Sequence, residues 1–527
     1  MKFLYSILLL IAPLLSYSQA LHIDSTRFIT GNNPTTSIIY SIATTDKGIL
    51  FVGADDGNPG GIIPYSPYEA GNVLIGKIDS NRQISWIKVY GCSGGAGARS
   101  ACQTADGGYA VLGNALSNDG YVTGFKGVVD MWLLRLDKDG NLLWEKCYGS
   151  SQDDGSMSIA NTPDHGFILL GATNGTDGDV PNHYGGFYGI DWLVIKTDSV
   201  GNVQWSRDLG TVNDEGDKGS ILSIGSSYYL VSAAISGDHD CTDTAWHTGV
   251  NAGYDVYILK LDASGNVLWD SSYGGSGTDN AVYAIFDVRD SSIVTVGSTN
   301  STDYMVTDYH GGNDDMWAIK VNKNGTLLWQ KTLGSNQEDH GTGLCAAHDS
   351  SYIVYGSINE GSIGGGDCWL SLLDNSGNES THKIFGGTDA ELPNSIITYL
   401  SGYVATGISA STVFTEGATN GRNCGGEEGY LSYLGYGLDE VPKIITAESS
   451  LIVFPNPAQD HVKAHLPNNS AGSISVINNI GQKISTQIIE YGTQDYDLNT
   501  IEWVNGIYFI IWRGEDGTVL TTKLIKD

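Results

Sequence analysis

Residues 130–146 read DMWLLRLDKDGNLLWEK and contain the unit from which most of the chain is built. The apolar run that follows Asp130 ends at the polar stretch Asp137–Asn141, and a second apolar run carries Trp144. Two apolar runs joined by a short polar turn are typical of a β-hairpin. Gly140 stands at the turn position where a positive φ is favoured. The stretch therefore predicts two short antiparallel strands joined by a tight turn.

The same pattern returns about every 60 residues, which marks an internal repeat. The Trp after the turn recurs as Trp86, Trp144, Trp205, Trp269 and Trp329. The polar residue that opens an apolar strand recurs as Asn72, Asp130, Asp191, Asp255, Asp315, Asp367 and Glu428. The small residue that closes a β-branched strand recurs as Gly53, Gly113, Gly171, Ser232, Gly297, Gly356 and Gly407. The last two sets each have seven members, which indicates seven repeats.

A repeat of this length fits four short strands, and such a sheet cannot bury both of its faces alone. Sheets stacked face to face would bury each other's Trp and aliphatic side chains, and closing the row into a circle removes its exposed ends. We therefore predict an all-β fold in which residues 20–436 form a seven-bladed β-propeller. The Trp series is expected to lie mostly in the core.

The two ends of the repeat array are expected to share the seventh blade. Residues 21–56 supply the late part of a repeat, and residues 428–436 supply an early strand with nothing after it. A blade built from both ends would keep the ring closed. Arg82 stands where the other repeats have the turn Gly, so its turn is expected to be longer or strained.

Composition excludes several classes of protein. The chain has 27 Lys and Arg against 59 Asp and Glu, which gives a formal net charge of −32 and a pI near 4.4. A nucleic-acid binder needs a cationic surface, so no nucleic-acid partner is expected, and an anionic membrane surface would repel the chain. With 41% hydrophobic residues the chain can bury a large core, and its 70 Gly favour short strands and tight turns.

Residues 1–19 are typical of a secretory signal peptide. A basic residue precedes the apolar run 3–15, and small residues at the −3 and −1 positions permit cleavage before Gln19 or at the next few bonds. The apolar run is too short for a membrane-spanning helix and is interrupted by Pro13. No later segment is long and apolar enough, so the mature chain is expected to have no transmembrane segment.

Residues 450–527 differ from the repeats and predict a small β-sandwich of about five to seven strands, preceded by a linker at 437–449. Its marker residues are Pro455, Asn456, Pro457, Ala458, Gly481, Gly506, Ile507, Tyr508, Lys523, Leu524 and Lys526. In order and spacing these residues resemble the C-terminal sorting domain of the type IX secretion system of Bacteroidota. The resemblance implies recognition by the type IX secretion machinery after folding in the periplasm. It also implies passage across the outer membrane and removal of the domain, which leaves the protein secreted or at the cell surface.

The repeat turn carries a second resemblance. The stretch Asp139–Trp144, DGNLLW, resembles the repeats of secreted Bacteroidota propellers that carry this sorting domain, and also the Gly–Trp turn of pyrroloquinoline-quinone propellers. The quinone enzymes usually have eight blades and often an adjacent pair of cysteines, whereas no two of the seven cysteines are adjacent here. The likeness to the quinone enzymes therefore concerns blade geometry rather than chemistry.

Acidic loops supply the candidate metal ligands. They recur ahead of the strands that open with an acidic residue, so they are expected to gather on one rim of the ring. Close carboxylates and backbone carbonyls are ligands of Ca²⁺, whereas Asp and Asn in loops also serve to cap the backbone. The candidate Ca²⁺ ligands are Asp119, Asp130, Asp177, Asp179, Asp191, Asp238, Asp240, Asp303 and Asp315. No other cofactor is expected.

No catalytic residue is assigned, because the chain has no HExxH motif, no phosphate loop and no GxSxG in a strand–turn–helix setting. We expect an exported propeller that binds an extracellular protein or glycan through its loop-lined face without catalysis. One alternative is a secreted polysaccharide hydrolase or lyase with acidic residues at the mouth of the ring. A second alternative is a quinone- or metal-dependent oxidoreductase.

Overall fold

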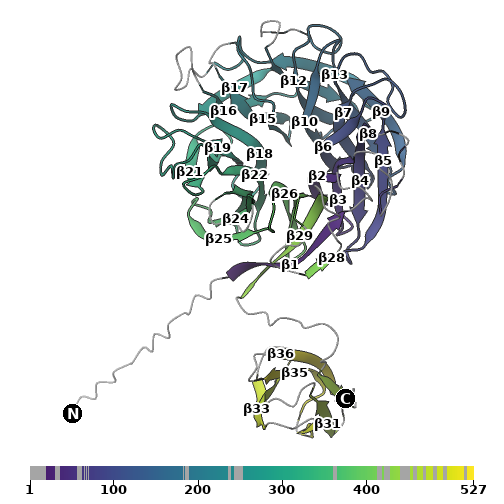
Figure 1. Cartoon of the computed structure of the whole chain (residues 1–527), viewed down its shortest axis with the longest axis vertical. Coiled ribbons are helices and arrows are strands. Elements are labelled where there is room, and N and C mark those ends of the chain that lie inside the picture. The colour runs from purple at the N-terminus through teal and green to yellow at the C-terminus, as the bar shows by residue number, and fades with distance from the viewer. Residues whose placement is uncertain are drawn as a thin grey trace, which may run out of the picture. The chain divides into compact units, whose positions relative to one another are not determined.

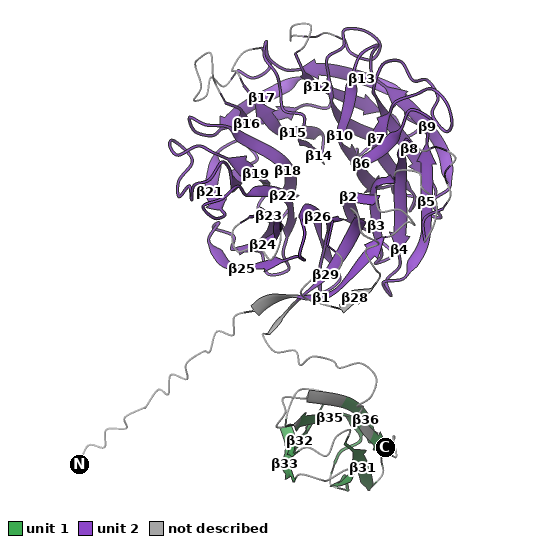
Figure 2. Ribbon diagram, in the orientation of Figure 1, with its two compact units in different colours: residues 1–19, 437–527 green, residues 20–436 purple. Residues whose placement is uncertain are grey.

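Strands account for all the regular structure that the computed structural model describes. The described residues are 19–29, 36–55, 62–64, 66, 68, 70–181, 183, 189–235, 239–242, 253–359, 365–411, 418–420, 428–438, 451–454, 458, 460–466, 471–478, 483–490, 495–501, 503–514 and 519–526. The described residues contain no helix, and therefore no helix that is long and apolar enough to cross a membrane. Two compact units are present: residues 20–436 form one, and the C-terminal β-sandwich belongs to the other (Figure 2).

Seven sheets, here called blades, are seen in the described part of residues 20–436. Six of them take four consecutive antiparallel strands each, in sequence order. Blade 1 has β2 (Thr36–Ala43), β3 (Ile49–Asp55), β4 (Asn72–Ile78) and β5 (Ile84–Gly91), and blade 2 has β6 (Ala96–Gln103), β7 (Tyr109–Ala115), β8 (Asp130–Leu136) and β9 (Leu142–Tyr148). Blade 3 has β10 (Asp154–Asn161), β11 (Phe167–Thr173), β12 (Asp191–Thr197) and β13 (Val203–Leu209), and blade 4 has β14 (Ser220–Ile224), β15 (Ser227–Ala234), β16 (Asp255–Leu261) and β17 (Val267–Tyr273). Blade 5 has β18 (Asp279–Asp287), β19 (Ser292–Thr299), β20 (Asp315–Asn322) and β21 (Leu327–Leu333), and blade 6 has β22 (His340–Ala346), β23 (Tyr352–Ile358), β24 (Asp367–Leu373) and β25 (Glu379–Phe385).

Blade 7 takes strands from both ends of this unit. Its order is β26 (Glu391–Tyr399), β27 (Gly402–Ser409), β29 (Glu428–Leu438) and β1 (Gln19–Ile29), with β28 (Ala418–Asn420) parallel to β1 at the edge. The first strand of each blade lies innermost, and β2 contacts both β6 and β26, which closes the circle (Figure 1). The assignment of residues 36–55 to the shared blade was wrong, because β2 and β3 begin blade 1 and only β1 completes blade 7.

Each blade buries both of its faces against its two neighbours. Side chains alternate between the faces of a strand, so on β7 Val111 packs toward blade 1 and Leu112 toward blade 3. All seven residues of β8, β12 and β24 are buried, which explains their continuous apolar sequence. Seven apolar clusters fill the seven interfaces of the described ring, and the cluster between blades 7 and 1 contains Ile29, Phe51 and Leu431.

The repeated Trp and the repeated turn Gly meet across the blade interfaces. A Cβ on Gly201 of blade 3 would lie 2.8 Å from the ring of Trp144 in blade 2. The Tyr148 hydroxyl donates a hydrogen bond to the Gly201 carbonyl at 2.7 Å. The corresponding pairs are Trp86 with Gly140, Trp205 with Gly265, Trp269 with Gly325, and Trp329 with Gly377. These Trp side chains are half-buried and pack against the edges of the apolar clusters. The buried Trp side chains of the third strands are Trp132, Trp192, Trp317 and Trp369.

The turn that contains Arg82 is strained and not longer. Arg82 has a φ of +62°, and its N–H donates to the Asp79 carbonyl at 3.0 Å, as the N–H of Gly140 does to Asp137 at 3.1 Å. Blade 7 lies on this side of blade 1, and its outer strand β1 has no Trp. The Arg82 guanidinium instead lies 4.4 Å from the centroid of the Tyr433 ring. The turn therefore requires Gly only where a Trp packs on it.

A β-bulge in the inner strands explains the third repeated Gly. In blade 1 the register shifts between Ile38 and Tyr40, and a Cβ on Gly53 would lie 1.8 Å from the Ser37 carbonyl oxygen. The same shift faces Gly113, Gly171, Gly297, Gly356 and Gly407. Strand β14 pairs with β15 without a shift, and there Ser232 replaces Gly. Bulges re-aim side chains, and here they present one extra residue near the axis of the ring in each of the other six blades.

The second unit is the β-sandwich predicted at the C-terminus. One sheet has β30 (Ile452–Phe454), β31 (His461–His465) and β34 (Asp495–Asn499), and the other has the order β33 (Lys483–Ile489), β32 (Gly472–Asn478), β35 (Gly506–Gly514) and β36 (Val519–Lys526). These seven described strands enclose a core that includes Ile474, Ile510 and Trp512. Pro455, Asn456, Pro457 and Gly481 lie outside the described residues.

The Gly–Trp contact predicts a measurable difference between two glycine substitutions. Gly201→Ala should lower the free energy of unfolding by about 2–4 kcal/mol, because it combines a positive-φ penalty with overpacking against Trp144. Gly107→Ala is the matched control, since Gly107 also has a positive φ (+84°) but no atom lies within 4 Å of a Cβ there. The control should cost only about 1 kcal/mol in urea unfolding. Equal losses would show that the Trp contact contributes nothing.

Candidate functional site

The acidic residues that open the third strands are buried inside the blade interfaces. Asp130, Asp191 and Asp315 are each 0% exposed. The Asp130 carboxylate accepts hydrogen bonds from the N–H groups of Lys126 at 2.8 Å and Gly127 at 3.1 Å. Asp315 accepts the N–H of His310 at 2.6 Å. These three side chains therefore lie inside the ring wall and not on its rim.

Each of these acids faces a second carboxyl group at the start of the next blade. At Gly274, a Cβ would lie 2.1 Å from an oxygen of Asp255 and 2.5 Å from an oxygen of Asp279, so the two carboxyl groups flank the glycine. The backbone joins the same partners, because the N–H of Asp279 donates to the carbonyl of Tyr254 at 2.6 Å. The pairs are Asp130 with Asp154, Asp191 with Glu215, Asp255 with Asp279, Asp315 with Asp339, and Asp367 with Glu391.

Sequence reasoning missed the second member of each pair. It stands five residues after the Gly that ends the outer strand, at Gly149, Gly210, Gly274, Gly334 and Gly386. This recurring G-x4-[DE] pattern was the available signal. The interface between blades 1 and 2 has Asn72 and Ala96 in these places and therefore lacks the carboxyl pair, and the Asn72 amide donates to the Tyr68 carbonyl at 3.0 Å.

Burial of facing carboxyl groups raises their pKa values. Burial, together with the carboxyl group of Asp367, raises the pKa of Glu391 to about 7. Burial is also the main cause of the raised pKa values of Asp154 and Asp339. Glu391 still accepts hydrogen bonds from the Ser409 hydroxyl at 2.8 Å and the Gly387 N–H at 2.9 Å. These groups hold the strand entries in place rather than facing a substrate.

The acidic loop residues cap the backbone between blades. Asp119, Asp177 and Asp303 accept the N–H groups of Ser93, Ser151 and Ser276, each at 2.7 Å. Asp179 accepts the N–H of Gly149 at 3.0 Å and lies 3.0 Å from the Lys126 ammonium. Asp238 lies outside the described residues, and Asp240 is half-buried in the loop between β15 and β16. Ca²⁺ binding at these loops stays a prediction.

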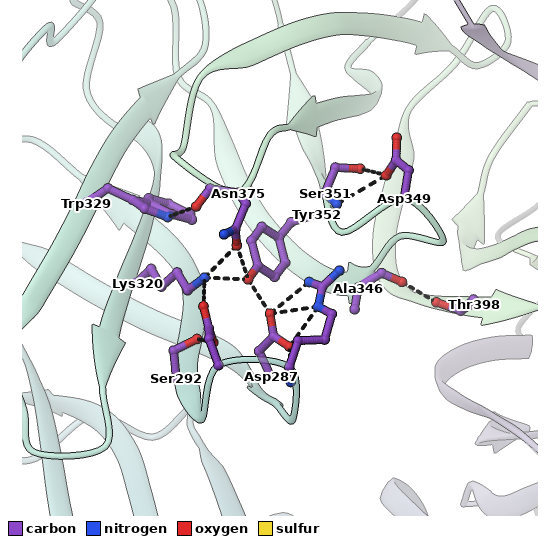
Figure 3. A network of polar contacts seen from close by, with 12 residues as sticks. Asp287, Ser292, Lys320, Trp329, Ala346, Asp349, Ser351, Tyr352, Asn375 and Thr398 are labelled. Atoms are coloured by element: carbon purple, nitrogen blue, oxygen red, sulfur yellow. Dashed lines mark hydrogen bonds and ion pairs between the residues drawn. The ribbon is translucent and has the colours of Figure 1, made fainter.

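A second set of contacts joins buried cations on the third strands to acidic turns. The pairs are Asp46 with Lys77, Asp106 with Arg135, Asp164 with Lys196, and Asp290 with Lys320. Figure 3 shows one such network, in which the Lys320 ammonium donates to the Tyr352 hydroxyl at 2.8 Å and to Asn375 Oδ1 at 2.7 Å. Tyr352 in turn donates to Asp287. Because the donors and acceptors satisfy one another, this network has a structural role: it holds blades 5 and 6 together.

A hollow of about 460 Å³ lies at the mouth of the ring's axis, where the inner strands of blades 5 to 7 begin. Its wall includes Asp217, Lys218, Asp314, His340, Thr342 and Asn394. Thr342 and Asn394 are bulged residues of β22 and β26. A smaller hollow of about 350 Å³ includes Arg99, the bulged residue of β6. The bulges at Arg99, Thr342 and Asn394 therefore place different side chains at the same end of the ring.

Two tyrosines contact each other across the axis of the ring. The Tyr40 and Tyr283 hydroxyl oxygens, from blades 1 and 5, lie 3.3 Å apart. Each tyrosine directly follows a bulged residue, and their ring centroids are 6.1 Å apart. Because blades 1 and 5 are not neighbours, this contact spans the axis. The hollow is thus suited to binding a group that enters from one side.

One cluster at the hollow is suited to chemistry. Asp314 and His340 line the hollow, and Glu338 lies beside them, with one ligand or proton-transfer atom of each residue within 4.8 Å of the others. The His340 ring nitrogen Nε2 lies 3.1 Å from Glu338. Burial, opposed by His340 and aided by Glu338, raises the pKa of Asp314. The blades that lack this combination show that it is not part of the repeat.

The marker residues of the C-terminal sandwich meet at one edge. Gly506, Ile507 and Tyr508 of β35 pair with Lys526, Ile525 and Leu524 of β36. The N–H of Ala458 donates to the Ile525 carbonyl at 2.7 Å. The side chains of Tyr508 and Leu524 are buried, whereas Lys523 is exposed. Residues from the two ends of the domain thus meet through backbone hydrogen bonds along β36.

The fold and its C-terminal domain define a secreted β-propeller protein that carries its own sorting signal. Residues 452–527 match the family described as the secretion system C-terminal sorting domain, so the type IX secretion signal is present and directs the protein to the cell surface or the extracellular space.

Comparisons of the whole chain are more distant. A curated relative, the regulatory protein FlaEY of Caulobacter vibrioides, is 27% identical over 215 residues, which are 33% of this chain and 20% of that protein. This chain therefore spans about a fifth of that relative's length. The WD40 domain of Neurospora crassa Pan2 aligns with a TM-score of 0.42 at 10% identity, covering 81% of this chain and 99% of that one. A protein of unknown function from Bacteroides caccae aligns with a TM-score of 0.33 at 10% identity, covering 67% and 94%.

The carboxyl pairs predict that the fold loses stability as the pH rises. The folded pKa of Glu391, about 7, is above the ordinary value near 4.3, so the folded state binds more protons between these values. The free energy of unfolding should therefore fall by about 2 kcal/mol from pH 4.5 to pH 7.5, measured by urea unfolding.

Glu391→Gln should remove this contribution to the dependence of the free energy of unfolding on pH. Asp164→Asn is the control with the opposite sign. Burial raises the pKa of Asp164, but hydrogen bonds from Lys196 and Thr162 outweigh it and lower the value to about 2, so its contribution is lost only as the pH falls below about 4. An unchanged slope in Glu391→Gln would contradict the pair's role.

Proposed function

We propose that the protein is an exported, non-enzymatic binding propeller whose ligand, a glycan or a polar protein segment, sits in the hollow of blades 4–7. The observation that carries the proposal is the difference between the ring wall and its mouth. In the wall, acidic side chains recur in most repeats and accept hydrogen bonds from backbone N–H groups or from buried cations. At the mouth, the side chains differ from blade to blade and face an open hollow. A site that recognises one ligand needs such variation on a rigid scaffold.

A second candidate function rests on Asp314 and Glu338. Two close carboxyl groups, one with a raised pKa, are what a polysaccharide hydrolase uses as acid and nucleophile. The hollow would then hold a sugar chain that is cut and not merely bound. Release of reducing sugar from a polysaccharide panel, lost in Glu338→Gln, separates this candidate from a binding module.

Filling the hollow should abolish binding without unfolding the ring. In a glycan array and in capture of extracellular protein by the secreted form, Thr342→Trp should weaken binding at least about 10-fold, because an indole occupies space the ligand needs. Thr326→Trp, at an exposed turn between β20 and β21, is the control and should bind normally. Equal binding by both variants would place the ligand elsewhere.

Export is proposed to use both ends of the chain. A signal peptide cleaved before Gln19 would leave β1, which begins at Gln19, intact to complete blade 7. Deletion of residues 450–527 should reduce the extracellular amount at least about 10-fold and leave a folded propeller in the periplasm, as measured by immunoblotting of cell fractions in a Bacteroidota host. An unchanged extracellular yield would overturn the role of the sorting domain.

A further inference from the structure

Four carboxyl groups converge in the interface between blades 3 and 4. Asp191 and Glu215 are the pair found at this position in other interfaces, and Asp208 and Asp240 join them. The carboxyl group of Asp191 is within hydrogen-bonding contact of both Asp208 and Glu215. Among the described residues, Asp208 is the added acid that has no counterpart in the other blades. The corresponding residues are Val89, Cys147, Ser272, Thr332 and Ile384.

The Asp208 side chain is fully buried and has no hydrogen-bond donor. Its side chain is 0% exposed, and both of its carboxylate oxygens are buried without a hydrogen-bond partner. Glu215 Oε2 and Asp240 Oδ2 are also buried without a hydrogen-bond partner. A buried carboxylate normally accepts hydrogen bonds or faces a cation. These four oxygens, two from Asp208 and one each from Glu215 and Asp240, belong to one cluster.

The neighbouring interface shows what balances such a cluster. Between blades 2 and 3, the corresponding acids are Asp130, Asp154 and Asp179. The ammonium group of Lys126 lies 3.0 Å from Asp179 and donates to the Cys147 carbonyl at 3.0 Å. It also lowers the pKa values of Asp130 and Asp154, although burial raises them more. One fixed cation thus serves three acids there.

The cluster between blades 3 and 4 has more acid, and the described residues around it include no such lysine. The loop that enters its third strand supplies His183, whose side chain is 4% exposed. Its Nδ1 atom lies 3.0 Å from Asp191 Oδ2 and 3.5 Å from Asp208 Oδ2. One ligand atom each from His183, Asp191 and Asp208 lies within 4.8 Å of the others. This is a spacing at which the three side chains can reach one ion.

We propose that this cluster is a structural site for a divalent metal cation, held by Asp191, Asp208 and His183, with Glu215 and Asp240 beside them. The cation does in this interface what Lys126 does in the preceding one. Carboxylate oxygens with one imidazole nitrogen favour Mn²⁺ or Zn²⁺ over Ca²⁺, which prefers oxygen alone. The site joins blades 3 and 4, so its occupancy stabilises the ring rather than serving the hollow at the mouth. The inference does not depend on the proposed ligand.

Metal binding is tested on the full mature chain, stripped with EDTA and titrated with MnCl₂, ZnCl₂ or CaCl₂ at pH 7.5. Calorimetry and elemental analysis should show one bound Mn²⁺ or Zn²⁺ per chain and weaker binding of Ca²⁺. A metal concentration 100-fold above its Kd should raise Tm by about 3 °C.

Asp208→Asn should weaken the metal affinity at least about 10-fold and remove the rise in Tm. In EDTA the same variant should be at least as stable as the wild type, because it removes one of four facing carboxyl groups at nearly constant volume. This reversal distinguishes a lost ligand from a damaged fold. Asp208→Ser, which introduces the residue that blade 4 has at position 272, should behave in the same way. Asp139→Ser removes an exposed carboxylate and is the control, with unchanged binding.

Two results would overturn the proposal. If the stripped protein binds none of the three metals, the carboxyl groups share protons and no cation is held. If metal binds equally well to Asp208→Asn and to the wild type, the ion sits elsewhere. Tighter binding of Ca²⁺ than of both Mn²⁺ and Zn²⁺ would overturn the assignment of His183 as a ligand.

Discussion

The whole ring depends on burying two apolar faces of every sheet. A four-stranded sheet whose third strand is buried along its full length has no face to offer to water, so each blade needs two neighbours. The last interface, between blades 7 and 1, exists only because β1 and β29 come from opposite ends of the unit. Ring closure thus buries the two faces that an open row of blades would expose.

Polar groups that are buried with these faces have to be satisfied within the interfaces. The Trp on each turn Gly and the Tyr on its carbonyl fix how two blades approach each other. The carboxyl pairs fix where each new blade begins. The pairs of buried cations with acidic turns fix the opposite end of the strands. Burying like charges costs free energy, so such pairs are poor sources of stability. We infer that they contribute to a unique register between blades, because a slipped blade would leave the carboxyl groups without their N–H donors.

The repeat period made much of the fold predictable, since hairpin turns and apolar runs are local signals. The turn Gly, the strand-opening acids and the composite blade could be read from spacing alone. The sequence alone does not show which repeats contact each other. Trp144 packs on Gly201, in a different repeat, so its half-buried state depends on a partner about 57 residues away that spacing alone does not identify. Residues 36–55 were placed in the wrong blade for the same reason, because the start of a repeat is arbitrary in sequence and fixed only by pairing.

The candidate sites were harder to predict because acids are common in this chain. Among 59 Asp and Glu, those that repeat are structural, and repetition was the feature that drew attention to them. Asp208 and Asp314 were not predicted because each is an acidic residue at a position where the other repeats have a different residue, so no recurring pattern marks it. In a ring of similar blades, a residue that recurs in every blade has a structural role that all interfaces share. A ligand or ion is not shared by all interfaces, so the residues that bind it are expected at positions where one blade differs from the rest.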